Sequence, residues 1–321
     1  PLFGQSYIPT HDGEYHIIRF MEFWKMLTQG YYFPRWAPEL NSGFGFPLFN
    51  FHYPLPNYVG AFWHLWGFDF VSSFKLTLAS GYLLAAFFCF FWLKKLWGVW
   101  PAVVGTIVAA YTPYWFVDLY VRGVVGEVWA LTFVFASLTA IEYKKRVILA
   151  LCVAGLILSH NILAMLFLPF LVGYIFISNL KFKISNYYPL LIGIGLSAYF
   201  WLPALMERQF VQGLNTVNFS NHFAEIYELL IPSWGSGFSA SGMANKMSFQ
   251  IGLIPLLCVA FSMGLMRHTR HMRLMRLMVV VFFLAIFLTL PISRPIWELL
   301  PILQYVQYPW RFLSFVIIAA A

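Results

Sequence analysis

The stretch FKLTLASGYLLAAFFCFFWL, residues 74–93, decides the fold. It is a continuous apolar run whose one charge, Lys75, lies near its beginning, and Lys94 and Lys95 follow directly after its end. A helix rises about 1.5 Å per residue, so a run of this length spans roughly the 30 Å hydrocarbon core of a bilayer. The sequence therefore predicts a transmembrane helix at this position.

Eight further apolar runs of spanning or nearly spanning length follow this helix. The chain is 61% apolar and 10% charged, whereas a soluble domain carries about 25% charged residues. A soluble protein with an oversized core would also need polar residues along every surface helix, but here they gather between the apolar runs. We therefore predict an all-α polytopic membrane protein with about nine transmembrane helices, the last incomplete. The eight further runs are residues 99–116, 126–142, 147–160, 162–178, 188–206, 249–266, 277–291 and 312 onward.

The simplest domain organisation is one membrane domain over residues 1–321, because no internal repeat or low-complexity tract divides the chain. Residues 1–73 form a first extracytoplasmic loop with surface helices, and residues 74–321 form the transmembrane bundle. The chain begins at Pro1 and stops inside an apolar run. We expect it to be truncated at both ends, with one transmembrane helix before Pro1 and the rest of at least one after Ala321.

The basic clusters predict the orientation, because Lys and Arg concentrate in cytoplasmic loops. They occur at every second connection, at Lys94–Lys95, EYKKR (142–146), NLKFK (179–183) and RHTRHMRLMR (267–276). The formal charge of +8 is therefore an orientation signal rather than a nucleic-acid footprint, and we expect no nucleic-acid partner. The predicted location is the plasma (inner) membrane. The three cysteines are isolated within apolar runs, which indicates neither disulfides nor a thiolate metal site.

The segment SYIPTHDGEYHIIRF (6–20) concentrates ionisable groups on the predicted outer face. The amphipathic pattern after Asp12 predicts a helix along the membrane surface, closed by Gly30, and residues 31–66 read as a folded interfacial loop. A carboxylate at the lipid boundary is costly unless it faces water or a partner, so Asp12 and Glu14 are candidate catalytic residues. The alternative is that Asp12 only caps the helix that begins at Gly13.

A metal site is a second interpretation of the same segment. Asp12 and His16 are four residues apart and would share a helix face, and carboxylate with imidazole can bind a divalent metal. A third ligand would have to come from elsewhere. The alternative is that the histidines are surface and interface residues, and any cofactor, Mg or Mn included, stays undetermined from the sequence.

A second charged cluster, DLYVRGVVGE (118–127), lies on the same predicted face. Arg122 presents a planar fork suited to phosphate or carboxylate, while the alternative for Arg122 and Glu127 is an internal ion pair that ties the loop down. Further polar groups come from other connections on this face. The candidate substrate- or phosphate-binding residues are Arg35, Arg122, Glu127, His160 and Arg311.

Five stretches carry a resemblance to known membrane families: THDGEYHIIR, YYFPRWAPELNSGFGFPLFNFHYPLP, YVRGVVGE, LSHN and QYPWRF. Together they resemble the GT-C superfamily of polytopic glycosyltransferases and, more narrowly, a membrane family labelled 6-pyruvoyl-tetrahydropterin synthase-related. The resemblance implies a GT-C-like fold with the active site on the extracytoplasmic face. It also implies that Asp12 acts as general base on an acceptor hydroxyl, or as a metal ligand.

Three functions follow as hypotheses. The first is a glycosyltransferase that moves a sugar from a polyprenyl-phosphate donor to a glycan, lipid or protein acceptor outside the cytoplasm. The second is a transporter or flippase of lipid-linked sugars, which is disfavoured because transporters place ionisable residues near the membrane midplane and the predicted spans are almost free of charge. The third is a non-catalytic membrane module that binds a glycan or partner protein.

Overall fold

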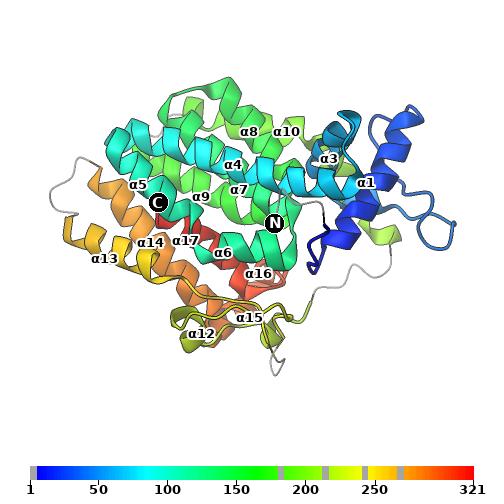
Figure 1. The fold of residues 1–321 in the computed structure, drawn as a ribbon. Helices are drawn as coiled ribbons and strands as arrows, with labels where there is room; N and C mark the ends of the chain where they lie inside the picture. Colours follow the sequence, from blue (N-terminus) through cyan, green and yellow to red (C-terminus); the bar gives the residue numbers. More distant parts are fainter. Residues whose placement is uncertain (1–5, 180–183, 212–216, 241–244, 266–270) are drawn as a thin grey trace.

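The computed structural model describes residues 6–179, 184–211, 217–240, 245–265 and 271–321, and these form a helical protein (Figure 1). No strand occurs within those ranges, where β-pairing is limited to two isolated bridges, Ala37 with Phe46 and Gly237 with Lys246. The predicted all-α fold is therefore confirmed for the described part of the chain.

The first segment packs three helices against one end of the bundle, at the right of Figure 1. They are α1 (Gly13–Thr28), α2 (Leu48–Phe51) and α3 (Leu55–Leu65). Phe23 of α1, Ala37 and Phe49 form a small core of their own. This core holds the interfacial loop onto α1 separately from the main bundle.

The bundle runs lengthwise across Figure 1, and a further group of short helices lies below it. Its first half comprises α4 (Phe70–Trp97), α5 (Val99–Ala110), α6 (Pro113–Phe116), the π-helix η1 (Val117–Arg122), α7 (Val125–Glu142), α8 (Arg146–Ser159), α9 (Asn161–Asn179), η2 (Ile184–Asn186), α10 (Tyr188–Leu196), α11 (Ala198–Glu207) and η3 (Arg208–Phe210). The remainder comprises η4 (Phe219–Asn221), α12 (Ile226–Leu230), α13 (Leu253–Leu265), α14 (Met272–Thr289), η6 (Pro291–Ser293), α15 (Arg294–Leu299), α16 (Pro301–Gln304), η7 (Pro309–Phe312) and α17 (Leu313–Ala319).

Four helices in the described ranges are long and apolar enough to cross a membrane: α4, α7, α9 and α14. Two bent pairs raise the number to six if each is one span: Val99–Ala110 with Pro113–Arg122, bent by 48°, and Tyr188–Leu196 with Ala198–Phe210, bent by 66°. The predicted runs at 147–160, 249–266 and 312 onward correspond to shorter apolar helices. The count of nine spans therefore stays a prediction. The basic cluster 179–183 lies largely outside the described residues, and 267–276 does so in part.

Helix α7 is the centre of the bundle. In its apolar window 78% of the residues are buried, against 28–44% in the other three long spans. Its polar side chains bond to the backbone of α4: Trp129 Nε1 donates to Thr77 O at 2.9 Å, and Thr132 Oγ1 donates to Gly81 O at 2.7 Å. Within a bilayer, burying apolar side chains between helices gives no hydrophobic stabilisation, because the lipid is equally apolar. Hydrogen bonds of this kind, together with small residues at the contact, then hold the helices together.

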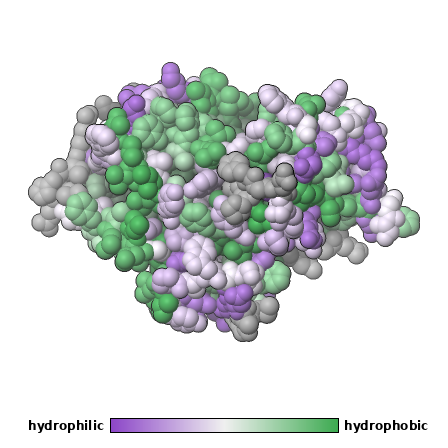
Figure 2. Space-filling view, viewed as in Figure 1, coloured by the Kyte–Doolittle hydropathy of each residue, from purple (hydrophilic) through white to green (hydrophobic). Residues whose placement is uncertain are grey.

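The surface follows the membrane pattern. Figure 2 shows hydrophobic residues over the side of the bundle, while hydrophilic residues gather at its right-hand end, over the first segment, and along the lower edge. The polar residues of the first segment thus lie at an end of the bundle rather than along its apolar side.

Candidate functional site

The start of α1 is fixed to the end of η1 through the backbone. The amide of His11 donates to Val121 O, and the amide of Asp12 donates to Arg122 O, both at 2.9 Å. Two segments more than a hundred residues apart therefore lie side by side. Asp12 and Arg122, which the sequence placed only on the same face, are direct neighbours.

Thr10, rather than Asp12, caps the first turn of α1. The Gly13 amide donates to Thr10 Oγ1 at 3.1 Å, whereas the Asp12 side chain makes no capping hydrogen bond. A β-carbon on Gly13 or Gly123 would overlap Thr10 Oγ1, so the threonine sits between the two glycines. Asp12 is partly exposed, and its carboxylate has no hydrogen bond or ion pair within the described ranges. The carboxylate is therefore held in place by the backbone but chemically available.

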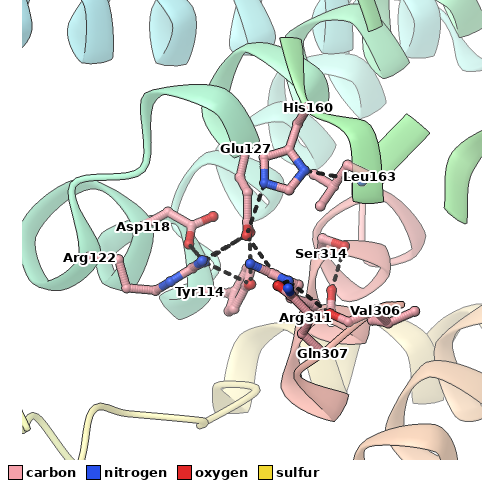
Figure 3. A network of polar contacts seen from close by, with 10 residues as sticks. All are labelled: Tyr114, Asp118, Arg122, Glu127, His160, Leu163, Val306, Gln307, Arg311 and Ser314. Carbon is pink, nitrogen blue, oxygen red and sulfur yellow. Dashed lines mark hydrogen bonds and ion pairs between the residues drawn. The ribbon is translucent and has the colours of Figure 1, made fainter. Parts of the chain in front are cut away.

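Glu127 is the centre of a buried charge cluster (Figure 3). Arg122 binds its carboxylate through both terminal nitrogens, Nη2 to Oε1 at 2.7 Å and Nη1 to Oε2 at 2.9 Å. Arg311 Nε donates to Oε1 at 3.0 Å, and Tyr114 OH donates to Oε2 at 3.1 Å. The Glu127 side chain is fully buried, and the two arginine side chains are 6% and 9% exposed.

Local backbone geometry brings the cluster together. Gly123 takes φ 68°, in the left-handed region, which ends η1 and lets α7 begin at Val125. Glu127 thereby lies in the first turn of α7, where the helix dipole favours a negative charge. Arg122 also donates to Asp118 Oδ1 at 2.5 Å. The two carboxylates and two guanidinium groups balance, so the buried cluster is neutral overall when all four are ionised.

Further guanidinium contacts come from η7 and the residues before it. Arg122 stacks on the Trp310 ring, 4.5 Å from its centroid, and Arg311 lies 4.9 Å from the centroid of Tyr308. Arg311 Nη1 also donates to Val306 O at 2.8 Å and to Gln307 Oε1 at 2.9 Å. Both arginines are thus engaged with protein groups, so the internal ion-pair interpretation of Arg122 and Glu127 describes the observed geometry.

His160 lies on the other side of Glu127. Its Nδ1 accepts a hydrogen bond from the Leu163 amide at 3.2 Å, which places the proton of the neutral ring on Nε2. Nε2 is 3.8 Å from Glu127 Oε1, beyond hydrogen-bond range. The imidazole therefore faces the carboxylate without binding it directly.

A row of rings links this cluster to α1. The ring centroids of His160 and Tyr53 are 5.0 Å apart, those of Tyr53 and His52 are 4.0 Å apart, and those of His52 and His16 are 5.9 Å apart. Burial lowers the pKa of His16 well below its usual value, and the positive charge of Arg19 lowers it further. Burial and Arg19 lower the pKa of His52 in the same way. Both rings are therefore neutral at physiological pH.

Within the described residues, Arg35 and Glu14 make no hydrogen bond or ion pair with the cluster. Arg35 donates to Asn50 Oδ1 at 2.7 Å and to Tyr199 O at 3.1 Å, and Asn50 in turn binds Glu207. Arg35 thus ties the interfacial loop to α11. Glu14 is exposed on α1 and makes no hydrogen bond or ion pair within the described ranges.

The residues present do not fit a divalent metal. Among the described residues, no group of three or more His, Cys, Asp or Glu side chains could hold a metal ion. Asp12 and His16 supply at most two ligands, and the third that the sequence interpretation required is not found there. No step of the chemistry is therefore assigned to a metal.

Four of the residues at this site were not proposed as site residues from the sequence. His52 and Tyr53 lie in the interfacial loop, Asp118 lies beside the pair that the sequence singled out, and Arg19 was passed over. The available signal was the spacing of Asp12, His16 and Arg19, four and three residues apart, which places all three on one face of a helix.

Comparisons with known proteins give a family but no named activity. An uncharacterised protein of Lactococcus lactis subsp. cremoris (strain MG1363) is 25% identical over 249 residues, which is 70% of this chain and 40% of that protein. The chain thus spans well under half the length of this relative. No solved structure matches the chain. A family of membrane proteins described as 6-pyruvoyl-tetrahydropterin synthase related matches residues 49–321, and the chain belongs to this family.

Proposed function

We propose that this protein is a glycosyltransferase that moves a sugar from a polyprenyl-phosphate donor to an acceptor hydroxyl, with Asp12 as general base. The observation that carries the proposal is the state of the Asp12 carboxylate. It is partly exposed and unpaired within the described ranges, while its backbone is anchored to Arg122 at 2.9 Å. A positioned carboxylate without a partner is what proton abstraction requires.

The chemistry is an inverting displacement. The acceptor oxygen attacks the anomeric carbon as its proton passes to the Asp12 carboxylate, and the bond from that carbon to the phosphate oxygen breaks. The electron pair of that bond leaves with the polyprenyl phosphate. The acceptor is a glycan, lipid or protein hydroxyl, on the extracytoplasmic face of the plasma membrane.

The buried cluster positions Asp12 in this proposal and does not bind the phosphate. Arg122 and Arg311 already hold Glu127, and Arg122 also holds Asp118. Removing these partners to admit a substrate phosphate would leave buried carboxylates unpaired, which is costly. The cluster instead fixes the end of η1, onto which residues 11 and 12 dock.

A transporter of lipid-linked sugars is the second candidate, and one observation favours it. Asp118 and Arg122 are buried in the Val99–Ala110 and Pro113–Arg122 pair, which is bent by 48°, and broken helices with ionisable groups mark many transporter sites. Sealed vesicles distinguish the two functions. A transporter moves the intact lipid-linked sugar across the bilayer, whereas a transferase consumes it.

The test compares Asp12→Asn with the wild type in the full-length protein. Each version is expressed in a host strain that lacks its own copy of the gene, and both the envelope glycans and the polyprenyl-phosphate sugars are measured by mass spectrometry. We expect Asp12→Asn to lower the transfer rate at least about 100-fold, since that is the usual contribution of a general base. The unused donor lipid should then accumulate.

Glu298→Gln is the matched control, because Glu298 is an exposed carboxylate paired only with Arg294. It should leave the glycans unchanged. Full transfer by Asp12→Asn at wild-type expression would remove Asp12 as the base. Unchanged glycans in the host strain without the gene would remove the transferase proposal itself.

A further inference from the structure

The face of α1 that carries Asp12 also carries polar groups without partners. His16 is 1% exposed, and its Nδ1 is buried with no hydrogen-bond partner among the described residues. The Nε2 of His52 is likewise buried and without a partner, and the two ring centroids are 5.9 Å apart. Most buried polar atoms in proteins are satisfied, so these two imidazole nitrogens in adjacent rings can each form a hydrogen bond with a further polar group.

Arg19 supplies the charge beside these rings. It lies three residues after His16 on α1 and is partly buried, and its positive charge acts on His16, His52 and Tyr53. Unlike Arg122 and Arg311, it makes no hydrogen bond or ion pair within the described ranges. A partly buried guanidinium normally binds carboxylate or phosphate.

The Arg19 guanidinium and the two imidazoles are together suited to bind an anion with several oxygens. The guanidinium offers a fork of N–H donors, and each neutral imidazole can carry its proton on the unsatisfied nitrogen. A water molecule would satisfy an imidazole nitrogen but would not neutralise Arg19. A carboxylate has two oxygens for these donors, whereas a phosphate group offers one more and carries more charge.

We propose that Arg19, His16 and His52 form the binding site for the phosphate group of the lipid donor, an inference that rests on the transferase proposal. Asp12 and Arg19 lie about two helical turns apart on one face, and side chains on a helix lean toward its N-terminus. A phosphate at this site therefore lies on the same face of α1 as Asp12. The donor phosphate carries one negative charge and the departing polyprenyl phosphate up to two, so the site stabilises the leaving group more than the substrate.

The test measures binding of dodecyl phosphate, a monoester with one alkyl chain, to the purified full-length protein in nanodiscs. We expect Arg19→Gln to weaken binding at least tenfold and His16→Gln to weaken it several-fold. Arg19→Lys keeps the positive charge but loses the planar set of N–H donors of the guanidinium. Its affinity for dodecyl phosphate should therefore lie between those of the wild type and Arg19→Gln. It also gives a result if Arg19→Gln folds poorly.

Arg294→Gln is the matched control, because Arg294 is exposed on a different element and pairs with Glu298. Its affinity should stay within twofold of the wild type. Affinity of Arg19→Gln within twofold of the wild type would overturn the site, and so would an equal loss in Arg294→Gln. Inorganic phosphate is the second probe: binding as tight as that of dodecyl phosphate would assign the site to free phosphate and overturn the lipid assignment.

Asp12→Asn separates this inference from the proposed function. It should abolish transfer while keeping dodecyl phosphate binding, since it removes a negative charge near the anion. Loss of binding in Arg19→Gln therefore tests the phosphate site even if Asp12 is not the base. Loss of transfer in Asp12→Asn tests the base even if the phosphate binds elsewhere.

Discussion

At the scale of single residues, the Glu127 carboxylate joins the two arginines of the buried cluster. It is fully buried and accepts hydrogen bonds from Arg122, Arg311 and Tyr114. A buried ion pair contributes little net stability when intact, because desolvation offsets the attraction, but removing one partner leaves the other charges uncompensated. The cluster therefore fixes the relative positions of η1, α7 and η7 more than it stabilises the fold.

Glu127→Gln should destabilise the protein by about 3–5 kcal/mol, the usual result of breaking a buried pair. The two guanidinium groups would then lose the charged carboxylate that they share. Thermal unfolding of the purified protein in detergent measures the effect. Glu298→Gln, in an exposed pair, should cost less than about 1 kcal/mol. Equal losses in the two variants would contradict this account of the cluster.

At the scale of elements, the junction between η1 and α7 depends on one glycine. Gly123 takes φ 68°, and a β-carbon there would overlap Thr10 Oγ1. The same residue therefore provides both the turn that aims Glu127 and the space into which the segment before α1 docks.

Gly123→Ala should cost about 1–2 kcal/mol for the left-handed backbone and a further 1 kcal/mol or more for the overlap with Thr10. Gly30→Ala is the comparison for the first of these costs, because Gly30 follows the end of α1 with φ 90° and no described atom lies within 4 Å of a β-carbon there. The two unfolding temperatures give the difference. Limited proteolysis should also cut the segment before α1 faster in Gly123→Ala. If both variants lose the same stability, the close approach of Thr10 is not important.

Sequence patterns predicted the long helices well and their breaks poorly. The run 126–142 became α7, and 74–93 became the centre of α4. The single runs at 99–116 and 188–206 are each broken, at Thr112 before Pro113 and at Ser197. Hydropathy measures composition along the chain, and it does not see where a proline or a local hydrogen bond turns the axis.

The site was predicted in part for a related reason. Alternation of basic loops placed Asp12, Arg122, Glu127, His160 and Arg311 on one face. The structure brings Arg122, Glu127 and Arg311 into direct contact, with Asp12 beside Arg122 and His160 facing Glu127. Which cation is paired and which is free depends on side-chain directions that no local pattern encodes. Arg19 was passed over because its distinguishing feature is the absence of a partner.

At the scale of the whole molecule, buried neutral histidines link stability to pH. The pKa of His16 is lowered by burial and by the positive charges of Arg19 on α1 and Arg122 on η1. Below the unfolded pKa of about 6.5, the unfolded chain binds a proton that the folded chain does not. Stability is therefore greatest above this pH and falls as the pH drops below it.

Lowering the pH from 7.5 to 5.5 should remove about 1.4 kcal/mol of stability through His16 alone, with a loss in the same direction from His52. His16→Gln should reduce this acid sensitivity, measured as the change in unfolding temperature between the two pH values. Arg294→Gln, a change at an exposed residue outside this row, is the control and should keep the wild-type slope. An identical slope in His16→Gln and the wild type would show that His16 does not titrate on unfolding.

The double attachment of Glu127 also sets a chronology for the newly made chain. Arg122 precedes Glu127 by five residues, whereas Arg311 follows it by 184. At about 5–20 residues per second, the ribosome adds Arg311 roughly 10–40 s after Glu127. During that interval Arg122 is the partner that keeps the Glu127 carboxylate from entering the membrane as an unpaired charge. Arg311 binds Glu127 only later, when the helices that carry it have been synthesised and have packed against α7.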